Sequence, residues 1–219
     1  LDREGSLVIC EHEGEVSRLD PTGNRAVLAA EWDGKSLNSP NDLCINSRGS
    51  VYFTDPTYGM NKSLGKERAR QLDFSGVYRI DYNGKLSLLV KDLATPNGIC
   101  LSPDEKTLYV TNHSKGEIWA YPLKGIDLAG EGKVLAQTKS GTRSAGADGI
   151  RVDEAGNLYT AGRGGIHVFK PTGEFIGLIG LEESPTNLVF GDDDRKTIYA
   201  TGSRGSIYRI RVNIPGAVK

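Results

Sequence analysis

The chain has 219 residues, of which 28 are acidic and 27 basic, for a formal net charge of −1. This balance indicates neither a nucleic-acid partner nor an anionic membrane surface, and no apolar run approaches the roughly 20 residues of a membrane-spanning helix. The 28 glycines follow no three-residue period, which excludes collagen. Because Val, Ile, Leu and Tyr recur throughout, the composition predicts a soluble, folded protein.

The first residues, Leu1-Asp2-Arg3-Glu4-Gly5, are neither an initiator methionine nor a signal peptide, and resemble the middle of a hairpin turn. We therefore expect residues 1–219 to be a single domain that is truncated at its N-terminus, and the compartment is predicted no further than cytoplasmic or periplasmic. Three cysteines, Cys10, Cys44 and Cys100, have no CxxC spacing. They are expected to be buried free thiols rather than disulfides or zinc ligands.

One hairpin pattern repeats along the chain, and its second strand carries a tyrosine in each copy. The tyrosines Tyr52, Tyr109, Tyr159 and Tyr199 are separated by 57, 50 and 40 residues, and a period of about 40–50 residues is typical of propeller blades. Further hairpins are indicated by turns such as Asn83-Gly84. The sequence predicts an all-β chain of five units with three, four, four, four and three strands, or 18 in total. The segment from Lys62 to Leu72 is expected to be a short helix or an ordered loop.

In a propeller the innermost strand of each blade begins at one mouth of the central channel. The residues expected there are Asn41, Asn97, Asp148 and Asn187, and each has a side-chain oxygen. Such a ring of oxygens suits a hard cation such as Ca²⁺, which takes 6–8 oxygen ligands. The alternative is that Asn and Asp serve as turn residues before each strand. Since the four positions supply one carboxylate, a second acidic ligand is expected from a blade before Leu1.

Six motifs in order resemble the gluconolactonase branch of the senescence-marker/gluconolactonase/luciferin-regenerating family. They are Leu37-Asn38-Ser39-Pro40-Asn41-Asp42, Tyr52-Phe53-Thr54-Asp55-Pro56-Thr57-Tyr58-Gly59, Leu72-Asp73-Phe74-Ser75-Gly76-Val77-Tyr78-Arg79, Thr95-Pro96-Asn97-Gly98, Gly146-Ala147-Asp148-Gly149 and Ser184-Pro185-Thr186-Asn187. The resemblance implies a six-bladed β-propeller with a divalent metal, commonly Ca²⁺, with Zn²⁺, Mg²⁺ or Mn²⁺ as alternatives. It also implies that the first blade, which carries the family's metal-binding Glu, is missing, so about five blades are present.

The resemblance also assigns roles to individual residues. Asn97 and Asp148 correspond to metal ligands, and Asp148 is also the proton-transfer residue. Asn41 and Asn187 are expected on the substrate side of the metal, and Tyr58, in the Pro-Thr-Tyr-Gly loop, is expected to contact the substrate. The implied reaction is hydrolysis of a sugar lactone whose carbonyl the cation polarises. Hydroxide generated at the cation is the alternative to Asp148 as the base.

Two other functions stay open for this fold: organophosphate hydrolysis and a non-catalytic binding platform. The expected partner is a small-molecule lactone, with no nucleic acid and no membrane, and the complete propeller is expected to be a monomer. The chain alone is expected to bind Ca²⁺ weakly, to hydrolyse lactones poorly, and to aggregate or self-associate, because terminal repeat units need a neighbour.

Overall fold

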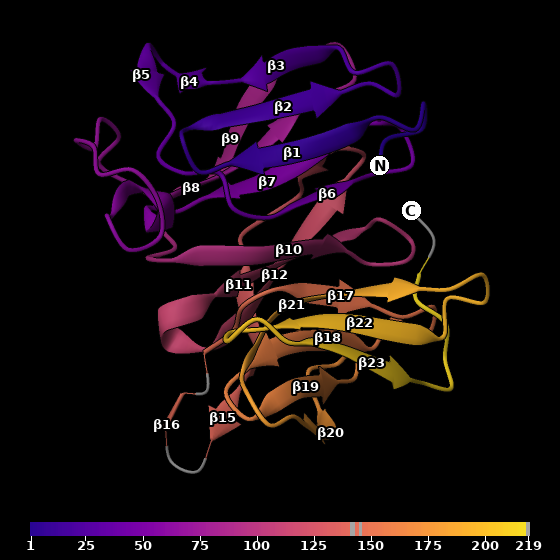
Figure 1. Cartoon of the computed structure of the whole chain (residues 1–219). Helices are drawn as coiled ribbons and strands as arrows, with labels where there is room; N and C mark the ends of the chain where they lie inside the picture. Colours follow the sequence, from indigo (N-terminus) through magenta and orange to yellow (C-terminus); the bar gives the residue numbers. More distant parts are fainter. Residues whose placement is uncertain (141–142, 145, 218–219) are drawn as a thin grey trace. The chain divides into compact units, whose positions relative to one another are not determined.

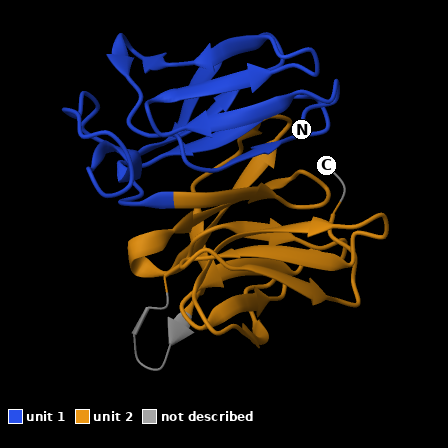
Figure 2. Ribbon diagram, viewed as in Figure 1, with its two compact units in different colours: residues 1–96 blue, residues 97–219 orange. Residues whose placement is uncertain are grey.

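A computed structural model describes residues 1–140, 143–144 and 146–217. The described residues form 23 strands and two three-residue 3-10 helices, η1 (Tyr58–Met60) and η2 (His113–Lys115). Figure 1 shows the strands as arrows coloured along the chain. None of the helices in this described part is long and apolar enough to cross a membrane. The chain divides into two compact units, Leu1–Pro96 and Asn97–Lys219 (Figure 2). The prediction of an all-β chain is confirmed.

Unit 1 contains two antiparallel sheets. The first has the order β1 (Leu7–Glu11), β2 (Glu15–Leu19), β3 (Arg25–Ala29), and the second has the order β6 (Leu43–Ile45), β7 (Val51–Asp55), β8 (Gly76–Ile80), β9 (Leu86–Val90). Two short strands, β4 (Glu31–Trp32) and β5 (Lys35–Ser36), pair with each other. Both sheets contribute to one apolar core, in which Val16 of β2 lies with Phe53 of β7 and Tyr78 of β8.

Unit 2 contains three larger sheets and follows the same plan. The first joins β10 (Pro96–Leu101), β11 (Thr107–Asn112), β12 (Glu117–Lys124) and β14 (Lys133–Gln137), with β13 (Asp127–Leu128) beside β12. The second is β17 (Ile150–Val152), β18 (Leu158–Gly162), β19 (Gly165–Phe169), β20 (Phe175–Gly180), and the third is β21 (Pro185–Gly191), β22 (Thr197–Gly202), β23 (Ile207–Arg211). The short strands β15 (Lys139–Ser140) and β16 (Arg143–Ser144) pair with each other.

Each of these five sheets has the topology of a propeller blade, in which consecutive strands pair antiparallel in chain order. Within the described residues the blades contain three, four, four, four and three strands, which is the predicted distribution. The five strands outside the blade count, β4, β5, β13, β15 and β16, have two residues each. The chain is therefore an all-β protein with five β-propeller blades, two in unit 1 and three in unit 2.

Burial follows the place of a strand within its blade. All five residues of β7, β8, β18 and β19 are buried, whereas the outer strands β20 and β23 contain only exposed and half-buried residues. The segment from Lys62 to Leu72 contains no helix among the described residues. The three cysteines are free, as expected, but only Cys100 is buried, and Cys10 and Cys44 are half-buried.

Candidate functional site

The backbone hydrogen bonds show which residues occupy equivalent positions in different blades. The Asn41 N–H donates to the Thr54 carbonyl at 2.9 Å, and the Thr54 N–H donates to the Asp42 carbonyl at 3.0 Å. In the same way, the Asp148 N–H donates to the Ala161 carbonyl, and the Ala161 N–H donates to the Gly149 carbonyl, both at 2.9 Å. Asn41 and Asp148 therefore occupy the same position, immediately before the residue that faces the second strand.

Threonine hydroxyls give the same alignment for the blade that begins with β10. The Thr54 hydroxyl lies 3.2 Å from the Asp42 nitrogen, and the Thr111 hydroxyl lies 2.7 Å from the Gly98 nitrogen. Gly98 is thus equivalent to Asp42, and the preceding residue, Asn97, is equivalent to Asn41.

The last blade differs from the expected alignment by one residue. Asn187 pairs with Thr201, as Gly149 faces Ala161, so Asn187 is equivalent to Gly149 rather than to Asp148. The residue at the position of Asp148 is Thr186. It is the extra residue of a β-bulge between the pairs Pro185–Gly202 and Asn187–Thr201, and bulges re-aim side chains near functional sites.

Hydrogen bonds connect these positions across the three blades of unit 2. The Thr111 hydroxyl, which accepts the Gly98 N–H, donates to the Asp148 carbonyl at 2.9 Å. The Gly149 N–H donates to the Thr186 carbonyl at 3.0 Å. The backbone segments that carry Asn97, Asp148 and Thr186 therefore lie next to one another.

Glycine follows Asn97 and Asp148 because the next blade passes very close at that point. A Cβ atom on Gly98 would lie 2.4 Å from the Asp148 carbonyl oxygen, and one on Gly149 would lie 2.1 Å from the Asn187 Oδ1 atom. Asn187 thus points its side chain toward the neighbouring blade. Its Oδ1 atom also accepts the Leu188 N–H at 2.8 Å.

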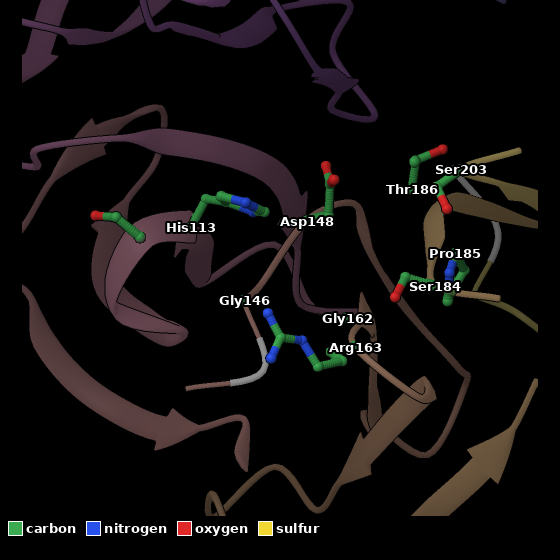
Figure 3. A pocket seen from close by; sticks show the side chains of 10 residues that line it. His113, Gly146, Asp148, Gly162, Arg163, Ser184, Pro185, Thr186 and Ser203 are labelled. Carbon is green, nitrogen blue, oxygen red and sulfur yellow. The ribbon is translucent and has the colours of Figure 1, made fainter. Parts of the chain in front are cut away.

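Asp148 and Thr186 line a pocket of about 370 Å³ in unit 2 (Figure 3). The imidazole of His113 points toward Asp148, and Arg163 extends from the turn after Gly162 toward Gly146 (Figure 3). Within the described residues, Asn97 and Asn187 are not part of the lining, and Asn97 is 5% exposed. The full lining is His113, Ser114, Gly146, Asp148, Gly162, Arg163, Ser184, Pro185, Thr186 and Ser203.

The donor set around Asp148 suits a hard cation. Asn97 offers an amide oxygen and Asp148 a carboxylate, both of which Ca²⁺ accepts as ligands. Among the residues that the structure describes, no group of three or more His, Cys, Asp or Glu side chains is placed to hold a metal ion.

In unit 1 a buried network around Asp55 fixes the loop that carries Asn41. The two Asp55 carboxylate oxygens accept the N–H groups of Asn38 at 2.8 Å and of Ser39 at 2.6 Å. The Ser39 hydroxyl accepts the N–H of Gly59 at 2.9 Å, next to Tyr58. One carboxylate thus supports the segments of both Asn41 and Tyr58. Burial raises the pKa of Asp55 to about 7, against the lowering effect of these hydrogen bonds.

Arg163 and Ser203 line the pocket in unit 2 but belong to none of the motifs quoted from the sequence, and Ser184 and Thr186 belong to the last of those motifs but were given no role. Thr186 had a usable signal in its distance to the next apolar residue. Leu43, Ile99 and Ile150 stand two positions after Asn41, Asn97 and Asp148, and Leu188 stands two positions after Thr186. Arg163 lies in the Gly162-Arg163-Gly164-Gly165 turn, where no hydrophobic period reports on side-chain direction.

Comparisons with known proteins support the resemblance. A family profile described as the SMP-30/Gluconolactonase/LRE-like region matches residues 1–204. A gluconolactonase from Zymomonas mobilis is 36% identical over 210 residues, which are 92% of this chain and 58% of that protein. A gluconolactonase structure from Xanthomonas campestris superposes with a TM-score of 0.86 and 32% identity, covering 99% of this chain and 70% of that one.

A relative with a different activity also matches. The diisopropyl-fluorophosphatase of Loligo vulgaris is 28% identical over 183 residues, which are 80% of this chain and 57% of that protein. The chain thus spans 58% and 57% of the length of these two curated relatives.

Proposed function

Because this chain belongs to the SMP-30/gluconolactonase/LRE-like family, we propose that it carries the reaction site of an enzyme that hydrolyses a sugar lactone. The observation that carries the proposal is the alignment in unit 2. Asn97 and Asp148 occupy equivalent positions in neighbouring blades, and the Thr111 hydroxyl bridges the adjoining backbones through Gly98 and Asp148. Asp148 also lines the pocket that is open to a small molecule.

A divalent cation, Ca²⁺ in the first instance, is part of this proposal, with Zn²⁺, Mg²⁺ or Mn²⁺ as alternatives. Asn97 and Asp148 would hold it, since their amide and carboxylate oxygens are the ligands that hard cations prefer. When bound, such a cation supplies Lewis-acid polarisation of the lactone carbonyl. We place the five blades within a six-bladed ring, as the resemblance implies.

The side chains have distinct tasks in the proposed reaction. Asp148 takes a proton from the attacking water and returns one to the ring oxygen as the lactone opens. Asn41 and Tyr58, held by the Asp55 network of unit 1, orient the substrate. Asn187 is also proposed to contact the substrate. Because its Oδ1 atom already accepts the Leu188 N–H, its amide NH₂ group is the part suited to a substrate hydroxyl.

Because the chain alone is expected to hydrolyse lactones poorly, the test measures its low hydrolysis of D-glucono-1,5-lactone at high protein concentration, with Ca²⁺ and with a chelator. Activity should require the cation, and Asp148→Asn should lower kcat by about 100-fold or more, since a positioned proton-transfer residue contributes about 10²–10⁴-fold. The matched control is Asp153→Asn, because Asp153 is a fully buried carboxylate that holds Asn157 and Tyr159 and does not line the pocket. If Asp153→Asn and Asp148→Asn lose equal activity at equal folded concentration, Asp148 has no special role.

Organophosphate hydrolysis is the second candidate, favoured by the similarity to the phosphatase from Loligo vulgaris. Diisopropyl fluorophosphate, assayed beside the lactone, decides between the two reactions. Turnover of the phosphorus ester alone would replace the first proposal. Binding of either compound without turnover would instead indicate a non-catalytic binding platform.

A further inference from the structure

The pocket of unit 2 holds a cationic side chain that the proposed reaction does not use. Asp148 is the one carboxylate in the described lining, and Arg163 is the one guanidinium. Figure 3 shows Arg163 extending toward Gly146, whereas the carboxylate of Asp148 points away from it. Within the described residues no carboxylate forms an ion pair with Arg163, although several other arginines, such as Arg204 and Arg211, have such partners.

The backbone of Arg163 is held firmly for a residue at a hairpin tip. Arg163 and Gly164 form the two-residue turn between β18 and β19, which closes with the pair Gly162–Gly165. Gly164 has φ +87°, a conformation that favours glycine. The turn is also bound from outside the hairpin, because the Leu181 N–H donates to the Gly164 carbonyl at 3.1 Å.

A buried histidine completes this support. His167 is 1% exposed, and its Nε2 atom lies 3.2 Å from the Arg163 carbonyl. Since a carbonyl only accepts, Nε2 carries the proton. Burial lowers the pKa of His167, which favours the neutral ring. The origin of the Arg163 side chain is therefore fixed at the pocket edge, so less ordering is needed when a ligand binds.

We propose that Arg163 is the anion-binding residue of this pocket and that it binds a carboxylate or similar oxyanion of the lactone or of its hydrolysis product. This inference rests on the proposed function for the identity of the ligand. A guanidinium matches the two oxygens of a carboxylate with two parallel hydrogen bonds. The hydroxyls of Ser184 and Thr186, which also line the pocket, suit the sugar hydroxyls of the same molecule.

Two sources of the anion fit this chemistry. The substrate can carry an acidic substituent in addition to its lactone ring, or the anion can be the carboxylate that ring opening creates. In the first case Arg163 selects acidic lactones. In the second case Arg163 holds the product, and its removal relieves product inhibition.

The experiment compares wild-type chain with Arg163→Gln and Arg163→Lys, with Arg204→Gln as the matched control. Arg204 is also exposed at a hairpin tip, but its guanidinium faces Glu183 and it does not line the pocket. Binding of D-gluconate is measured by calorimetric titration, which needs no turnover. Arg163→Gln should bind gluconate about 10- to 100-fold more weakly, the range expected for loss of a charge-assisted hydrogen bond. Arg163→Lys should recover part of this affinity, and Arg204→Gln should match wild type.

Kinetics then distinguish the two sources. Loss of kcat/KM on a glucarolactone, with unchanged kcat/KM on neutral gluconolactone, identifies an acidic substituent as the ligand. Unchanged kcat/KM on both lactones, with weaker inhibition by gluconate, identifies the product carboxylate. Equal gluconate affinity in wild type and Arg163→Gln, or no gluconate binding by wild type, overturns the inference. Arg163-dependent binding without lactone turnover would sink the proposed function and leave this inference standing.

Discussion

Replacement of Asp55 by asparagine tests whether one buried carboxylate sets the loop that carries Asn41. Asp55 is fully buried, and its two oxygens accept the N–H groups of Asn38 and Ser39. In Asp55→Asn one oxygen becomes an NH₂ group, so one of these buried N–H groups loses its acceptor and faces another donor. Leaving such a group unsatisfied costs about 1–3 kcal/mol. For a chain of this size that lowers Tm by about 2–12 °C.

The pH dependence sharpens this prediction. Burial raises the Asp55 pKa from 3.8 to about 7, so the folded state keeps a proton that the unfolded chain releases above about pH 4. Wild-type stability should therefore fall between about pH 4 and pH 7, by up to about 4 kcal/mol from this group. Asparagine does not titrate. The stability difference between wild type and Asp55→Asn should therefore be larger at pH 5 than at pH 8.

Thermal unfolding at pH 5 and pH 8, together with amide hydrogen exchange at Asn38 and Ser39, checks both parts. Asp81→Asn is the control, because Asp81 accepts the N–H groups of Asn83 and Lys85 in an exposed turn, where water replaces the lost acceptor. Its effect should stay within about 0.5 kcal/mol. Equal Tm for wild type and Asp55→Asn at pH 5, or a difference that widens toward pH 8, would refute the reasoning.

Three further predictions concern unit 2. Thr186→Val should lower kcat/KM on a lactone more than Asn187→Ala does, because the strand register gives Thr186 the position of Asp148. A larger loss in Asn187→Ala would instead support Asn187 as the equivalent of Asp148, as expected from the sequence. The contribution of His167 to stability should fall as pH drops below about 6.5, since a histidine with a lowered folded pKa takes up a proton on unfolding. Urea unfolding of wild type and His167→Gln at pH 7.5 and 5.5 checks this, and the stability advantage of wild type over the variant should be smaller at pH 5.5. Gly98→Ala should lower the free energy of unfolding by about 1–3 kcal/mol, the range for overpacking, because the new Cβ meets the Asp148 backbone. An unchanged midpoint of urea unfolding would count against that close approach.

The blades were predictable because their signals are local. The tyrosines Tyr52, Tyr109 and Tyr159 mark second strands, and turns such as Asn83-Gly84 join two short apolar runs. The two-residue strands lacked such a signal, because pairs such as Glu31–Trp32 with Lys35–Ser36 are too short to show any period. The number of blades in a closed ring is a property of contacts beyond any single hairpin, so it stays a prediction.

The candidate site was predictable in part. The roles of Asn97 and Asp148 stay predictions, but the structure brings their backbones together, as the repeat suggested. In the sequence, Asn187 was aligned with Asp148 by residue type. The strand register instead follows the apolar residue Leu188, and the bulge at Thr186 obscures this spacing. Arg163 reaches the pocket from a turn, and its direction depends on contacts from Leu181 and His167 that no local pattern reveals.

The close approach at Gly98 and Gly149 limits how freely the blades of this chain can be exchanged. Each glycine belongs to one blade, but the atoms that require it belong to the next: the Asp148 backbone in one case and Asn187 in the other. A chimera that receives the blade of Asp148 therefore needs a glycine at the position of Gly98 in the blade before it. The imported blade must also keep Gly149, because Asn187 of the blade after it approaches there. Duplication of one blade would carry only half of each such junction.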